Sequence, residues 1–141
     1  KGMAQATYSA SSLRAAFAKA QRSCREEATQ MLAFVGESKL TSVLEQQFSL
    51  GWGNRLERQA LHFLPVVKAA GGTYEMALDH LLATRMFRAG KVTGRYDVKS
   101  EDLRNVENAL NEVWGALFPS GMPERCLMAI EKDIKRLERG G

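Results

Sequence analysis

Two groups of basic residues are the part of this sequence whose type and spacing could do chemistry. In the first group, Arg55 and Arg58 follow a Gly-Trp-Gly-Asn turn at 51–54 and open a segment with helical periodicity. An arginine there can project from a helical body toward a phosphate, because its planar fork pairs with two phosphate oxygens. The first group therefore predicts a nucleotide-sensing site, and the alternative is a surface arginine paired with a carboxylate.

The second group is a set of five basic residues around a loop that contains Gly90 and Gly94. Its members are Arg85, Arg88, Lys91, Arg95 and Lys99. Such a cluster could follow a nucleic-acid backbone or meet the acidic face of a protein partner. Only Tyr96 adds an aromatic ring, so a base-stacking platform is not indicated. A solvated basic loop is the alternative interpretation.

The residue patterns of common catalytic sites are missing. The phosphate-cradling loop GxxxxGK[ST] is absent, and so are GxSxG, HExxH and a Cys–His pair at recognisable spacing. Asp79 and His80 are neighbours, but adjacent helical residues point about 100° apart and do not form a dyad. Glu57, Glu75 and Asp79 have no partner constellation and are interpreted as solvated charges. We predict no catalytic residue and no enzyme activity for the chain by itself.

Cysteine, histidine and charge content narrow the class of protein further. Cys24 and Cys126 lie far apart, and with only His62 and His80 beside them the spacing of a zinc site is missing. Two buried, reduced thiols in a cytoplasmic protein are the expectation. No apolar run approaches the roughly 20 residues that span a membrane. The net charge of +4 favours an acidic or phosphate-bearing partner only weakly.

Helical periodicity and helix-capping residues predict the elements that position these groups. We expect one all-α domain over residues 1–141, an orthogonal or irregular bundle of about six helices. Residues 1–8 are expected to be a disordered lead. The predicted helices cover 9–36, 39–48, 55–70 (kinked or broken at Pro65), 74–88, 100–117 and the segment after Pro123. A short strand pairing near Val92 or 96–98 is the one exception considered.

Several side-chain placements follow from these patterns. The apolar residues of the first helix, from Leu13 to Val35, are expected to lie on one face of it. Met76 is placed in the apolar stripe of its helix, and the charged end from Lys132 to Arg139 is placed in solvent. The glycine turn is expected to need positive φ and to seat the Trp52 indole against the helical body. Asn54, which follows the turn, is expected to cap the next helix.

With these residues in view, the stretch from Phe48 to Leu137 resembles the C-terminal helical lid of AAA+ ATPases. The nearest branch is that of the modified-cytosine restriction GTPase McrB and its dynein-related relatives. The resemblance is carried by GNRL at 53–56, FLPVVKAAGG at 63–72, ALDHLLATR at 77–85, GRYD at 94–97 and FPS at 118–120. The long first helix has no counterpart in it.

The resemblance implies a lid that packs on a P-loop core outside these 141 residues. Arg55, with Arg58 second, matches the position of a sensor arginine that touches the γ-phosphate of ATP or GTP bound by that core. No cofactor is then expected on this chain alone. Because the first residue is Lys1 rather than methionine, the chain is expected to be an excised domain or a chain with trimmed ends.

Two other functions remain open from the sequence. One is a small helical nucleic-acid-binding protein that uses the basic loop at 85–99. The other is a protein–protein adaptor that uses exposed apolar residues near Leu50 and Trp52. A protein partner or an oligomer is expected under the lid and adaptor hypotheses, and neither a metal nor a membrane is expected under any of the three.

Overall fold

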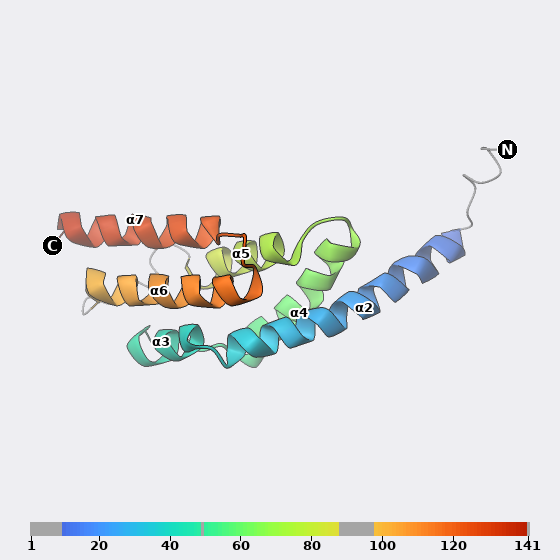
Figure 1. Ribbon diagram of the computed structural model, residues 1–141, viewed down its shortest axis with the longest axis horizontal. Helices are drawn as coiled ribbons and strands as arrows, with labels where there is room; N and C mark the ends of the chain where they lie inside the picture. The colour runs from blue at the N-terminus through green and yellow to red at the C-terminus, as the bar shows by residue number, and fades with distance from the viewer. Residues whose placement is uncertain (1–9, 49, 88–97, 141) are drawn as a thin grey trace.

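The computed structural model describes residues 10–48, 50–87 and 98–140, and within these ranges it is helical with no strand. Within these ranges, six helices follow one another (Figure 1). They are α2 (Ala10–Gly36), α3 (Lys39–Phe48), α4 (Asn54–Ala69), α5 (Tyr74–Arg85), α6 (Ser100–Leu117) and α7 (Glu124–Gly140). The predicted all-α bundle is confirmed.

The helix boundaries follow the periodicity and capping signals closely. Helix α4 runs without a break through Pro65, which is buried, so the alternative of two short helices is wrong. Asp102 accepts a hydrogen bond from the backbone N–H of Lys99 at 3.0 Å and so holds the start of α6. Pro123 directly precedes α7, where its missing N–H costs no helical hydrogen bond. The lead at 1–8 and the loop up to residue 97, with its considered strand pairing, lie outside the described residues.

The helices pack in pairs around one apolar core. Helix α2 packs on α4, α3 on α6, and α4 on α5, while α5 and α6 both pack on α7. The largest fully buried side chains include Trp114, Phe87, Leu32, Leu78 and Leu110, and they come from α2, α5, α6 and the residues that follow α5. This packing fixes α4 and α5 side by side, which is what positions the site described below.

Helix α2 does not bury its apolar face along its whole length. Ala28, Leu32 and Val35 in its C-terminal half are buried, but Leu13 is 57% exposed. Figure 1 shows the reason, because the N-terminal turns of α2 extend beyond the other described helices. The predicted apolar face of this helix is therefore buried only in its C-terminal half.

The glycine turn between α3 and α4 seats the Trp52 indole as expected, though by a different backbone conformation. A Cβ atom on Gly36 would lie 3.1 Å from Trp52 Nε1, so the ring packs directly on the end of α2. Gly53 has φ −85°, and among the described residues only Gly71 has positive φ, so the expected positive φ is wrong. Asn54 is the first residue of α4 and makes no capping bond, so that prediction is also wrong.

Two carboxylates of α5 are structural rather than solvated. Asp79 is 7% exposed, and its carboxylate accepts the backbone N–H groups of Arg125 at 2.9 Å and Cys126 at 3.0 Å. These donors belong to the first turn of α7, where they have no partner within the helix. Glu75 accepts a hydrogen bond from the indole Nε1 of Trp114 at 2.9 Å. The interpretation of Asp79 as a solvated charge is wrong, because a distant helix start supplies its partners.

Neighbouring side chains depart from prediction for related reasons. Met76, which was placed in the apolar stripe of α5, is 58% exposed, because the core-facing side of the helix is the one that carries Leu78 and Leu82. Cys126 is buried, and burial raises the pKa of its thiol, but Cys24 is only half-buried. The expectation of two buried thiols therefore holds for one of them.

The charged end of α7 also contains a buried acid. Asp133 is 3% exposed, so its placement in solvent is wrong. Burial raises the pKa of its carboxyl, and the neighbouring Arg136 guanidinium, 3.3 Å away, opposes that rise. A carboxyl whose pKa is higher in the folded than in the unfolded state stabilises the fold when protonated. That contribution is lost as the pH rises through the folded-state pKa.

We therefore predict that Asp133→Asn raises the melting temperature at pH 7. The amide keeps an acceptor oxygen for Arg136 but carries no charge that burial disfavours. Because the aspartate is favourable once protonated, the gain should shrink as the pH is lowered toward about 4, near the ordinary pKa of aspartate. Thermal unfolding followed by circular dichroism at both pH values measures this. A lower melting temperature of the variant at pH 7 would mean that the ion pair between Asp133 and Arg136 stabilises the fold by more than burial of the carboxylate destabilises it.

Candidate functional site in the groove between α4 and α5

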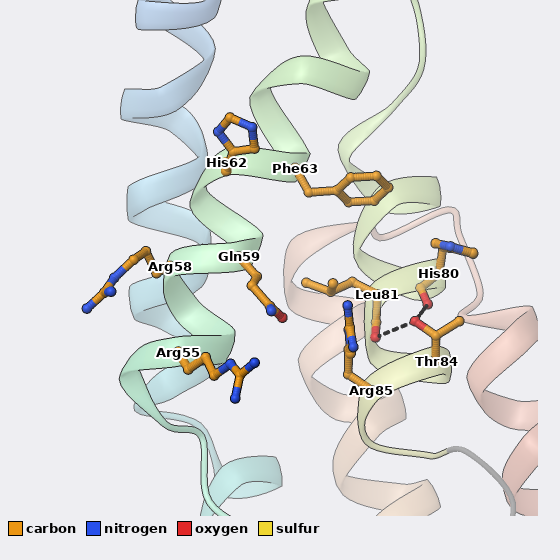
Figure 2. Close-up of a pocket in the computed structure, with 9 residues that line it drawn as sticks. All are labelled: Arg55, Arg58, Gln59, His62, Phe63, His80, Leu81, Thr84 and Arg85. Carbon is orange, nitrogen blue, oxygen red and sulfur yellow. Dashed lines mark hydrogen bonds between the residues drawn. The ribbon is translucent and has the colours of Figure 1, made fainter.

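A groove of about 660 Å³ lies between α4 and α5 (Figure 2). Helix α4 lines it with Arg55, Arg58, Gln59, His62 and Phe63. Helix α5 lines it with His80, Leu81, Thr84 and Arg85. On each helix these residues are three or four positions apart, or adjacent to such positions, which puts them on the side that borders the neighbouring helix.

The inner wall of the groove is apolar and its edges are basic. Leu81 is 6% exposed and lies at the base of the groove. Phe63 reaches from α4 across to α5, where its ring centroid lies 6.0 Å from that of His80 at an interplanar angle of 37°. Figure 2 shows this ring closing one end of the groove. A flat group with an apolar face could therefore rest against Phe63 and Leu81 with its charged part among the arginines.

The three arginines of the groove have no anionic partner within the described part of the chain. Arg55, Arg58 and Arg85 are exposed, and none of them makes a hydrogen bond or an ion pair with a described residue. No aspartate or glutamate is among the described residues that line the groove. By contrast, Arg104 on α6 pairs with Glu107 at 3.3 Å and Glu131 at 3.2 Å. The groove thus gathers positive charge that the described residues leave uncompensated.

The three guanidinium groups do not all point the same way. Figure 2 shows Arg55 reaching into the gap from α4 and Arg85 lying in the same gap on the α5 side. Arg58 points away from α5. Arg55, Gln59 and Arg85 also line a second hollow of about 370 Å³ toward Gly51 and Gly53. The Arg55–Arg85 pair is therefore the centre of the basic surface, with open space on both sides.

The chemistry that this arrangement supports is the binding of an anion. Two guanidinium forks on opposite sides of a gap can hold one phosphate group between them. The Thr84 hydroxyl donates to the carbonyl of His80 at 2.9 Å, and so it is engaged with its own helix. The described residues of the groove include no carboxylate that could orient either histidine as a base.

The structure joins residues that the sequence analysis assigned to separate groups. Arg85 was counted with the basic loop, but it lies across the groove from Arg55 because α4 and α5 pack together. Lys99 is exposed and immediately precedes α6. The other basic-loop positions, Arg88, Lys91 and Arg95, lie outside the described residues. Of the two predicted sites, the structure therefore describes the first completely and the second only at its ends.

Six lining residues were not predicted as part of a site: Gln59, His62, Phe63, His80, Leu81 and Thr84. The helical spacing that puts them on the same faces as the three arginines was present in the sequence, but nothing local showed that the two helices face each other. The adaptor hypothesis placed exposed apolar residues near Leu50 and Trp52. Both of these side chains are half-buried and pack on the core. The exposed large apolar side chains of the described chain are Leu13, Phe34, Met76, Met122 and Met128.

Within the described ranges, no three or more His, Cys, Asp or Glu side chains gather in a way that could hold a metal ion. None of the described helices is both long enough and apolar enough to cross a membrane. No protein-family model matches the chain, no curated protein matches it, and no solved structure matches it.

Proposed function

We propose that this chain is a helical lid or interaction module of a larger nucleotide-driven assembly, in which the α4/α5 groove receives phosphate groups of ATP or GTP. The nucleotide is bound mainly by a P-loop core outside these residues, and the chain catalyses no reaction alone. One observation carries the proposal. Three arginines line a single groove that contains no described carboxylate, over an apolar base formed by Leu81 and Phe63.

In this proposal Arg55 is the sensor and Arg85 faces it from the other helix. A nucleoside triphosphate carries more negative charge than the nucleoside diphosphate left after hydrolysis. The Arg55–Arg85 pair therefore favours the triphosphate state and binds the nucleotide less tightly once the γ-phosphate has left. Such a change in occupancy would turn the lid relative to its core and couple hydrolysis to movement. The resemblance to the McrB-type lid supports the assignment of Arg55, and the direction of its side chain in Figure 2 agrees with it.

The proposal places the protein in the cytoplasm, in contact with a protein partner or with further copies of its own assembly. Arg58, the second residue of the predicted sensor site, has a supporting role because its side chain points away from α5. Nucleic-acid binding, the second function predicted from the sequence, is supported by the position of Arg85 in the same basic groove. That possibility is developed separately below.

A phosphate series tests the proposed function. Isothermal titration of the chain with adenosine, ADP and ATP at low salt, without Mg²⁺, should give an affinity that rises with each added phosphate. Since hydrogen bonds to charged groups contribute about 1.5–3 kcal/mol, ATP should bind at least about tenfold more tightly than adenosine. The ATP affinity should fall as salt is added. Equal affinity for adenosine and ATP, or no binding of ATP at low salt, would contradict the proposal.

A further inference from the structure

A second basic groove lies on the other side of α5, between α5 and α7. It has a volume of about 330 Å³. Arg125, Lys132 and Arg136 stand along its α7 side, with Met128 between them at 65% exposure. These four residues are spaced three or four positions apart, and so they form one stripe along the helix. The α5/α7 groove is thus a row of cations interrupted by one exposed apolar side chain.

The two grooves meet on α5 and form one continuous surface. Thr84 lines both of them. His80 lines the α4/α5 groove, and its Nδ1 atom lies 3.2 Å from the guanidinium of Arg125, which lines the α5/α7 groove. The ridge of α5 that carries these two residues therefore separates two rows of positive charge without isolating them.

The joined surface carries more positive than negative charge. Six cations line it: Arg55, Arg58, Arg85, Arg125, Lys132 and Arg136. The one carboxylate among the described lining residues is Asp133, which is buried and pairs with Arg136. The net charge of this face exceeds the +4 of the whole chain, so the remainder of the protein is slightly acidic. Such segregation is the electrostatic footprint of a polyanion-binding surface.

We propose that this face binds single-stranded nucleic acid, with the backbone crossing the α5 ridge from the α4/α5 groove to the α5/α7 groove. Five of the six cations are arginines, whose forks match phosphate oxygens. Packed helices lie about 8–10 Å apart, so the two rows are separated by at most roughly 20 Å. That span corresponds to at most about six nucleotides at the duplex rise of roughly 3.4 Å per nucleotide.

The apolar parts of the two grooves favour a single strand over a duplex. In the α4/α5 groove an unpaired base can lie against Phe63 and Leu81, and in the α5/α7 groove Met128 offers a polarizable contact for another. A duplex keeps its bases stacked inside and could use only the charges. The proposal goes beyond the lid function, because the α7 row takes no part in holding a mononucleotide.

The test uses a fluorescent oligothymidine of about 12 nucleotides, a length within the usual range of single-strand sites. Its anisotropy is titrated with the intact chain between about 20 and 200 mM salt. The test variant is Arg125→Gln with Lys132→Gln. The control is Lys135→Gln with Arg139→Gln, which removes the same charge from the same helix at exposed positions that line neither groove. Circular dichroism confirms that both variants fold as the parent does.

The test variant should bind the oligonucleotide about tenfold more weakly at low salt. It should also flatten the slope of log K against log salt by about 1.4, because two phosphate contacts are lost at about 0.7 each. The control should change the affinity less than about twofold, and the ATP affinity should stay within about twofold in both variants. If ATP fails to bind while the oligonucleotide binds, the lid function falls and the present proposal stands.

Four results would overturn the proposal. The first is no binding of the oligonucleotide at low salt, and the second is a control that weakens binding as much as the test variant does. The third is a duplex of the same length that binds as tightly as the single strand. The fourth is polyglutamate of matched length that displaces the labelled strand as well as unlabelled oligothymidine does, which would indicate an acidic protein segment as the occupant instead.

Discussion

Replacing Asp79 by alanine is expected to lower the free energy of unfolding by about 3 kcal/mol. The carboxylate accepts two backbone N–H groups from the first turn of α7, and hydrogen bonds to charged groups contribute about 1.5–3 kcal/mol each. Without it, the N–H of Cys126 would be left buried with no acceptor. Urea unfolding followed by circular dichroism measures the loss.

The matched control for this prediction is Glu124→Ala. Glu124 is an exposed acid in the same first turn of α7, where it contributes only through the helix dipole. Its removal should cost less than about 1 kcal/mol. Asp79→Asn, which retains one acceptor oxygen, should lower the free energy of unfolding by an amount between those of the two alanine variants. Should Asp79→Ala prove no more destabilising than Glu124→Ala, the link from α5 to the start of α7 would not be a main support of the fold.

Replacing Arg55 and Arg85 together by glutamine is expected to weaken ATP binding more than tenfold. Each guanidinium is free of described anionic partners, so its whole hydrogen-bonding capacity is available to phosphate. Loss of one charge-assisted contact of about 1.5–3 kcal/mol corresponds to about tenfold or more in affinity. Because both residues are exposed, folding stability should change by less than about 0.5 kcal/mol. Isothermal titration of each single variant and the pair measures the effect.

Two comparison variants sharpen this result. Arg58→Gln should weaken ATP binding less than Arg55→Gln does, because the side chain of Arg58 points away from α5. Arg14→Gln, at the exposed N-terminal end of α2, should leave the affinity unchanged within about twofold. If the loss were the same for all four arginines, net charge alone would explain it and the groove would have no special role.

Local signals in the sequence were enough to predict the helices but not what each helix faces. Caps, glycine breaks and three- and four-residue spacing located α2, α3 and α6 within a few residues, because these signals act within one turn. Asp79 could not be assigned in this way, since its partners are 46 and 47 residues away on α7. The exposure of Leu13 could not be predicted from local signals either, because it depends on the fact that no other described helix reaches the first turns of α2.

The candidate site was half visible in the sequence. Arg55 was singled out because it opens a helix after a glycine turn, which is a local pattern. Arg85 was grouped with the loop that follows it, because only the packing of α4 on α5 brings it across from Arg55. The basic stripe of α7 was interpreted as solvated charge. Its spacing was readable, but the exposed Met128 within it and the groove beside it required the tertiary structure.

The most direct test of the proposed phosphate site is an NMR titration of the isotopically labelled chain with ATP. The account predicts that the largest shifts occur at the backbone amides of Gln59, Leu81 and Thr84 and at the side-chain Nε–H groups of Arg55 and Arg85. No shift at high ATP concentration, or shifts confined to α2, α3 or α6, would show that the α4/α5 groove does not receive the nucleotide.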